Sequence, residues 1–122
     1  MNVKSLKITH WVFTGLLCAM LTLSVVMYLT DTENVMNMME AMGFPRWLVY
    51  HITFAKAAGI VFLLYRKKPI LTEWAYAGLT FNFCLAISTH VYNGDGEGGG
   101  AIMALTLLMA SYGTRKMLMA KS

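Results

Sequence analysis

Lys56 has the most unusual position of any side chain in this sequence, because it lies near the middle of the apolar run LVYHITFAKAAGIVFLLY. A charged lysine at the centre of a bilayer costs about 2.5–3.5 kcal/mol on insertion scales, so such a residue generally contacts a polar partner or a ligand. Two roles follow. A lysine that loses its charge on burial can carry a proton, and a lysine that hydrogen-bonds across helices fixes their register.

Asn82 is the partner that spacing predicts for Lys56. Pro69 is 13 residues from each of them, so on two antiparallel helices joined near Pro69 they lie at the same depth. We expect the Lys56 ammonium to donate a hydrogen bond to the side-chain oxygen of Asn82. Small residues that permit close helix packing surround both positions: Ala55, Ala57, Ala58, Gly59, Ala75, Ala77 and Gly78.

Two histidines, His51 and His90, lie towards the other ends of the same two runs and complete the set of candidate polar-core or ligand-binding residues. Histidines on adjacent helices can hold haem, but these lie 18 and 21 residues from Pro69, at depths about 4.5 Å apart. No metal site is therefore predicted. No set of residues converges on a catalytic centre either, so the sequence does not indicate an enzyme.

The elements that position these residues are apolar helices. The chain has 122 residues, of which 57% are hydrophobic and 13% charged, too little polar surface to coat a soluble globule. Four apolar runs reach or approach the roughly 20 residues that span a bilayer, at about 8–29, 48–65, 71–91 and 98–114. The predicted fold is an all-α, antiparallel bundle of four transmembrane helices in a single domain, residues 1–122.

Basic residues report the orientation of this bundle. Lys and Arg gather before the first run, between the second and third, and after the fourth, whereas Arg46 is the basic residue of the other two loops. Because short cytoplasmic loops collect positive charge, both termini are expected to be cytoplasmic. The net charge of +4 is explained by this orientation, and since no basic patch interleaved with aromatic residues accompanies it, nucleic acid is not an expected partner.

The first external loop is predicted to contain a short amphipathic helix. Val35, Met38, Met39 and Met42 follow helical spacing there, ahead of the turn Gly43-Phe44-Pro45. Such a helix lies at the outer surface of the membrane and caps the mouth of the bundle. Its methionines could bind Cu(I), although apolar contact is the commoner use of such a stripe.

The segment PILTEWAYAGLTFNFCLAISTHVYNGD, together with the Gly43–Pro45 turn and Lys56, resembles the DoxX-like family of small bacterial membrane proteins. The resemblance implies a four-helix protein of the bacterial cytoplasmic membrane. The family's namesake is a small subunit associated with a thiosulfate:quinone oxidoreductase, and distant animal relatives include receptor-assembly chaperones. Many members carry Asp at the position of Asn82, where this chain keeps only a hydrogen-bonding amide. The most distinctive family element is Glu73, Trp74, Ala75, Tyr76, Ala77 and Gly78.

Three functions remain open from the sequence. The first is a non-catalytic membrane protein that binds a lipophilic small molecule or a partner membrane protein, with Lys56, Asn82 and His51 lining a polar interior. The alternative is a small quinone-binding subunit of an oxidoreductase, in which Lys56 and His51 hydrogen-bond the quinone. The third is a structural homo-oligomer built through the faces of small residues. Membrane lipid is an expected partner in each case, and quinone or lipid are the candidate cofactors.

Overall fold

A computed structural model describes residues 2–94, 96 and 98–121, and within these residues the chain forms five α-helices and no strand. The predicted all-α class is confirmed. In chain order the helices are α1 (Val3–Thr30), α2 (Thr32–Ala41), α3 (Leu48–Leu64), α4 (Pro69–Asn93) and α5 (Gly99–Ala120).

Two of these helices, α1 and α4, are long and apolar enough to cross a membrane. The third apolar helix, α3, has 17 residues, and α5 has 22 residues but is less apolar. The four membrane spans therefore stay a prediction for α3 and α5. The structure adds one fact that bears on them, since α3 and α5 pack directly against the two apolar helices.

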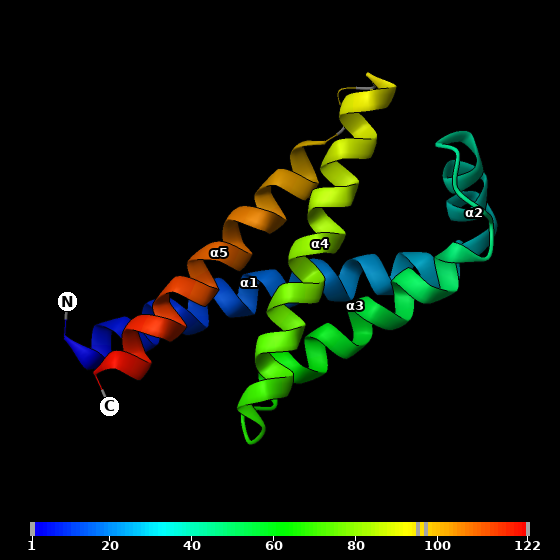
Figure 1. Cartoon of the computed structure of the whole chain (residues 1–122). Coiled ribbons are helices and arrows are strands. Elements are labelled where there is room, and N and C mark those ends of the chain that lie inside the picture. The colour runs from blue at the N-terminus through cyan, green and yellow to red at the C-terminus, as the bar shows by residue number, and fades with distance from the viewer. Residues whose placement is uncertain (1, 95, 97, 122) are drawn as a thin grey trace.

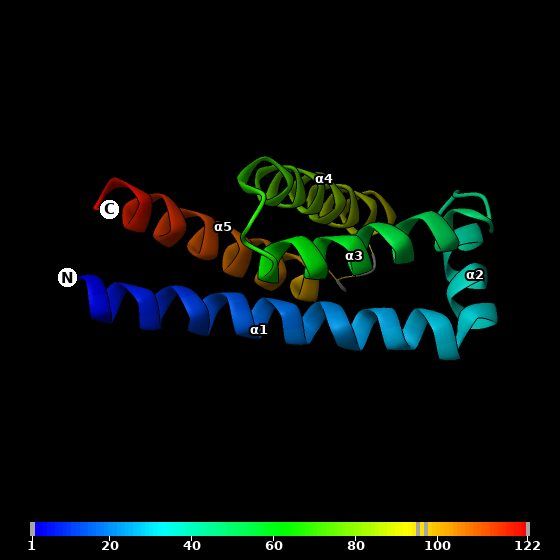
Figure 2. The ribbon, with the colours of Figure 1, turned by 90° about the horizontal axis from the view of Figure 1, so that it is seen from below.

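The four long helices pack in a ring, in which α1 and α4 each contact both α3 and α5. Figures 1 and 2 show α1 and α3 running side by side while α4 crosses them steeply. The two termini lie together at one end, beside the paired ends of α1 and α5 (Figure 1). At the other end α2 stands apart from the end of α4 and the start of α5, so the bundle is splayed there (Figure 1).

Helix ends follow local sequence rules. The side chain of Asn2 caps α1 by accepting a hydrogen bond of 2.8 Å from the backbone N–H of Ser5. Pro69 opens α4, where its missing N–H costs nothing, and Gly94 ends that helix with a φ of 62° that glycine adopts without strain. These signals fix the start of α1 and both ends of α4, the helix that carries Asn82 and the family element.

The predicted amphipathic helix is α2. It buries Val35 and Met39 against Val49 of α3. On the polar side of α2, Arg46 donates hydrogen bonds to Glu33 at 2.8 Å and to Glu40 at 3.3 Å. These acids, Glu40 foremost, raise the pKa of the Arg46 guanidinium. The helix is thus tied to α3 through its apolar face and to the loop before α3 through its polar face.

The core is apolar at its centre and the outer surface is apolar as well. Leu17, Leu63, Leu79 and Leu108, one from each long helix, lie in a single buried cluster. Large apolar side chains also point outward, among them Phe54 at 75% exposed. A soluble domain rarely shows so continuous an apolar surface, whereas a bilayer requires one.

Close packing between α3 and α4 depends on Gly59. A Cβ at this position would lie 3.0 Å from both methyl carbons of Leu79, whereas a Cβ at Gly78 would meet nothing within 4 Å. We expect Gly59→Ala to destabilise the protein by about 1 kcal/mol, since overpacking of about 1–3 kcal/mol exceeds the gain in helix propensity of about 1 kcal/mol. Gly78→Ala is the matched control and should stabilise it. Unfolding in SDS, followed by helical circular dichroism, measures both, and equal shifts of the same sign would contradict the close contact.

Candidate ligand-binding site

Lys56 is buried in the middle of α3, with 8% of its surface exposed. Its ammonium donates a hydrogen bond of 2.7 Å to the hydroxyl of Ser24 and lies 4.2 Å from the ring centre of Tyr28. Both contacts come from α1. A ring face attracts a cation electrostatically, and the attraction grows where water is excluded. Within the residues that the structure describes, the lysine is therefore stabilised by one hydroxyl and one aromatic face, without a carboxylate.

The hydrogen bond predicted between Lys56 and Asn82 is not formed, because the ammonium turns towards α1 and takes Ser24 as its acceptor. The depth argument matched α3 only with α4, the helix joined to it by the short loop. In a ring of helices each member has two neighbours, and α1 offers Lys56 a hydroxyl at the same depth. Ser24 and Tyr28 are the residues that this reasoning missed. A count of polar side chains at mid-depth on every predicted helix would have found Ser24.

Lys56 and Asn82 nevertheless border the same cavity. This cavity has a volume of about 110 Å³ and lies between α1, α2, α3 and α4 at the splayed end of the bundle. Its other polar groups come from Thr89 and His90 of α4. The apolar lining consists of Tyr28, Met38, Met39, Met42, Phe44, Ile52, Leu85 and Ala86.

A second cavity, of about 200 Å³, also borders Lys56 and Asn82. It lies towards α5 and reaches Ser24, Phe83 and Ala104. For scale, an apolar cavity of about 150 Å³ in another protein binds benzene. The space around Lys56 therefore has the size of a single ring or of a short stretch of acyl chain.

The polar groups of this site suit a ligand that accepts hydrogen bonds. An ammonium has three N–H donors, and within the described residues Ser24 is the single hydrogen-bond acceptor that Lys56 reaches. The hydroxyl of Thr89 already donates to the backbone oxygen of Leu85 at 2.7 Å. Asn82 contributes an amide with both donor and acceptor atoms. The methionines of α2 form a flexible wall that can adapt to apolar ligands of different shape.

His51 lies outside this site, which differs from its expected place in the polar interior. Its side chain is exposed and packs edge-on against Trp47, with ring centres 5.1 Å apart. The two residues His51 and Lys56 are five positions apart, which turns them about 140° from one another around α3. His90 of α4 lines the cavity instead. The two histidines are therefore not brought together.

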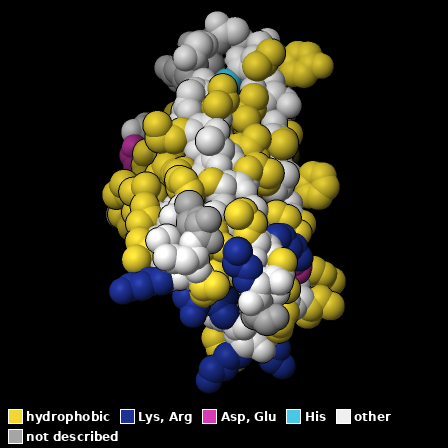
Figure 3. Space-filling model, turned by 90° about the vertical axis from the view of Figure 1, so that its left-hand side faces the viewer, with side chains coloured by type: hydrophobic (Ala, Val, Ile, Leu, Met, Phe, Trp, Pro, Cys, Tyr) yellow, Lys and Arg dark blue, Asp and Glu magenta, His cyan; other side chains and the backbone are white. Residues whose placement is uncertain are grey.

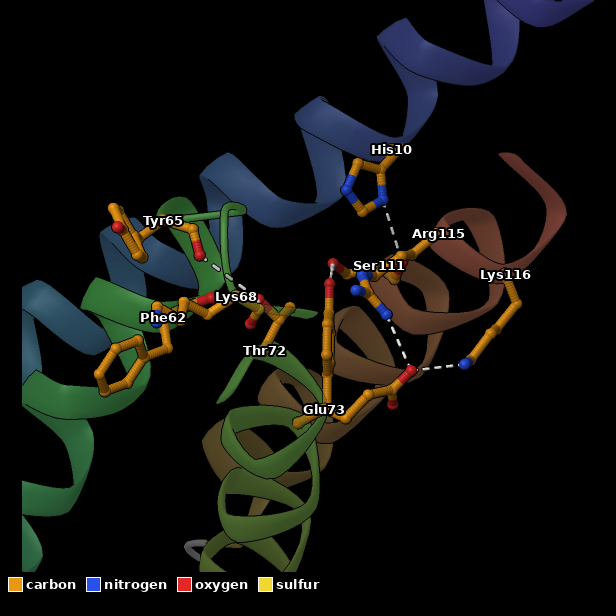
Figure 4. A network of polar contacts seen from close by, with 10 residues as sticks. His10, Phe62, Tyr65, Lys68, Thr72, Glu73, Ser111, Arg115 and Lys116 are labelled. Atoms are coloured by element: carbon orange, nitrogen blue, oxygen red, sulfur yellow. Dashed lines mark hydrogen bonds and ion pairs between the residues drawn. The ribbon is translucent and has the colours of Figure 1, made fainter. Parts of the chain in front are cut away.

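The family element lies at the opposite end of the bundle, where it joins α4 to α5 (Figure 4). Glu73 accepts a hydrogen bond of 2.8 Å from Arg115 and a second from Lys116. Trp74 points outward with 72% of its surface exposed. The small members Ala77 and Gly78 are exposed, and Ala75 packs against the core. The element thus serves helix packing and lies away from Lys56.

Tyr76, the remaining member, belongs to a buried polar network. Its hydroxyl lies 2.7 Å from that of Ser111, which in turn lies 2.6 Å from the hydroxyl of Thr14. The ring nitrogen Nδ1 of His10 lies 3.0 Å from the backbone oxygen of Ser111, as Figure 4 shows. This network ties α1, α4 and α5 together. Sequence reasoning missed it, although four polar side chains inside apolar runs were its visible signal.

Comparison with known proteins adds one finding. The model of the DoxX-like family matches residues 12–113, most of the chain. The chain belongs to the DoxX-like family. No curated protein and no solved structure matches this DoxX-like protein.

The matched segment begins after the first two turns of α1 and ends in the second half of α5, so it contains Lys56, Asn82 and the whole family element. The resemblance inferred from the sequence is therefore confirmed. Family membership, two helices able to span a bilayer and an outward-facing apolar surface agree that the DoxX-like protein is a membrane protein.

Proposed function

We propose that this DoxX-like protein binds a small lipophilic molecule inside its helix bundle and catalyses no reaction on it. The observation that carries the proposal is the buried ammonium of Lys56, which borders an apolar cavity together with Asn82. A lysine that served only to fix helix register would need a partner and no adjoining space. Here the amine has hydrogen-bonding capacity beyond Ser24, and space for an acceptor lies next to it.

The size and polarity of the cavity define the ligand class. A volume of about 110 Å³ favours a ring or acyl segment with at least one oxygen acceptor, and the methionines of α2 would contact the rest of the molecule. A quinone headgroup meets both conditions, so the alternative function, a quinone-binding subunit of an oxidoreductase, uses the same site. In that version Lys56, Asn82 and His90 would contact the quinone, whereas the sequence suggested Lys56 and His51.

The proposal includes the arrangement in the membrane. All four long helices would cross a bacterial cytoplasmic membrane, with both termini on the cytoplasmic side. Support comes from the distribution of charge, because Lys and Arg side chains gather on the lower part of the face that carries the termini (Figure 3). Cytoplasmic loops collect such residues. The cavity at Lys56 would then open towards the outer half of the bilayer, beneath α2.

Binding of a partner membrane protein is a second candidate, favoured by a different observation. An open cavity of about 210 Å³ lies between α3 and α4, and half of its lining residues are Ala or Gly, beside the exposed Trp74. Small residues let the backbone of another helix approach closely. A second copy of this chain could occupy the same surface. Crosslinking in membranes followed by mass analysis distinguishes a homo-oligomer from a complex with another protein. The small lining residues are Ala55, Ala58, Gly59, Ala75 and Gly78.

Lys56→Met tests the proposed ligand site. We expect the variant to bind decylubiquinone, a single-ring quinone probe, at least about tenfold more weakly, because a hydrogen bond from a charged donor contributes about 1.5–3 kcal/mol. The variant should fold and be as stable as the wild type or more so, since an apolar replacement removes a buried charge. Native mass spectrometry of protein released gently from lipid measures both the added quinone and any retained ligand.

The matched control is Lys67→Met, which removes the same charge from an exposed loop. It should leave quinone binding unchanged. Unchanged binding in Lys56→Met would contradict the ligand site, and loss of folding in that variant would instead favour a purely structural lysine. A retained lipid in place of quinone would favour the general lipophilic-ligand version over the quinone-binding subunit.

A further inference from the structure

A second hollow lies at the basic end of the bundle, far along the helices from Lys56. It has a volume of about 520 Å³ and is formed by the ends of α1 and α5 and by the loop before α4. Four cationic side chains line it, and His10, Trp11 and three apolar side chains complete it. Its lining is Val3, Lys7, His10, Trp11, Arg66, Arg115, Leu118, Met119 and Lys121.

Arg66 lines this hollow and has one unsatisfied side-chain nitrogen. Its Nε donates to the backbone oxygen of Leu63, and its guanidinium lies 4.7 Å from the centre of the Trp11 ring. Its Nη2 atom is buried and has no hydrogen-bond partner within the described part of the chain. Buried polar groups are nearly always hydrogen-bonded, so an acceptor is missing here. Burial also lowers the pKa of Arg66, which reflects a desolvated charge that a bound anion would stabilise.

Among the described residues, no carboxylate forms an ion pair with Arg66. Glu73 is the acid that the described ion pairs place at this end, and it is shared between Arg115 and Lys116. Lys7, Arg66 and Lys121 line the hollow without a carboxylate among its lining residues. Trp11 is partly exposed and marks the depth at which lipid headgroups meet the hydrocarbon. A cationic pocket at that depth, with apolar walls, matches an anionic lipid.

Positive charges that only set the orientation of the protein in the membrane do not need to line a hollow. The charges that set orientation need only lie in a loop, as the exposed Lys67 and Lys68 do. Arg66 and Arg115 are instead partly or largely buried and face one hollow with two further cations. We propose that this hollow binds the phosphate group of an anionic lipid headgroup, with Arg66 as its principal donor and Trp11 beside the glycerol and acyl region. This inference is independent of the ligand proposed at Lys56.

The test compares lipid binding to variants by native mass spectrometry. Detergent-solubilised protein is titrated with dioleoylphosphatidylglycerol and, separately, with zwitterionic dioleoylphosphatidylcholine. We expect the anionic lipid to bind more tightly, and Arg66→Gln to weaken its binding about fivefold or more. Lys67→Gln removes the same charge one position further along an exposed loop and should change binding little. An equal loss in both variants, or equal binding of the two lipids by the wild type, would overturn the proposal.

Two further measurements keep the result interpretable. If Arg66→Gln does not fold, Lys7→Gln takes its place, with the exposed Lys4→Gln as its control on the same helix. The lipid titration is also repeated with excess inorganic phosphate. Displacement of phosphatidylglycerol would show that the site recognises the phosphate group itself, and retention would identify the whole lipid as the occupant. Anionic-lipid binding that no lining variant weakens would refute the site.

Discussion

Glu73→Gln is expected to lower the free energy of unfolding by about 2 kcal/mol, below the range of about 3–5 kcal/mol for fully buried ion pairs because Glu73 is 31% exposed. The loss arises at Arg115, whose side chain is 9% exposed and would keep its charge without a carboxylate. Glutamine retains the shape of the side chain and its acceptor oxygen, so the variant isolates the charge. SDS unfolding followed by circular dichroism measures the change.

Lys116→Gln is the control for this prediction, because Lys116 contacts the same carboxylate from an exposed position. Its loss should leave stability unchanged, as exposed ion pairs contribute little. The double variant Glu73→Gln with Arg115→Met should recover much of the stability lost in Glu73→Gln, since no uncompensated charge remains. If Glu73→Gln and Lys116→Gln have equal effects, the pair with Arg115 does not anchor α4 to α5.

Ser111→Ala is expected to destabilise the protein by about 2 kcal/mol, because it removes two interhelical hydrogen bonds at a site that neither water nor lipid reaches. The hydroxyl of Tyr76 would lose Ser111 and keep its interaction with Arg66, whereas that of Thr14 still donates to the backbone oxygen of His10 at 2.8 Å. The main cost is therefore the desolvated phenol. The same unfolding measurement applies.

A double-mutant cycle with Tyr76→Phe separates the network from simple loss of volume. Once the phenol is absent, Ser111→Ala should cost markedly less, since no buried phenol is then left without its Ser111 partner. Thr106→Ala is the matched control on α5, because that exposed hydroxyl bonds to its own helix at Ile102. Additive effects of Ser111→Ala and Tyr76→Phe would exclude a coupled network.

These predictions concern a part of the molecule that sequence reasoning assigned only in outline. Glu73 was recognised as part of the family element, and the preceding basic loop was its nearest source of positive charge along the chain. Its partners instead lie 42 and 43 positions later, on α5. His10 and Ser111 are separated by 101 positions. Contacts of this kind depend on which helices are neighbours, and hydropathy does not encode that choice.

The sequence by itself determined the family, the all-α class, the membrane setting and the amphipathic α2, because each depends on local composition or on spacing along one helix. It also singled out Lys56 from the cost of its position. Tertiary structure decided the partner of Lys56, the separation of His51 from the site and the hollow at Arg66. The physical reason is that depth and periodicity constrain one helix at a time. Which side chains contact each helix face is decided only when the four long helices pack into a ring.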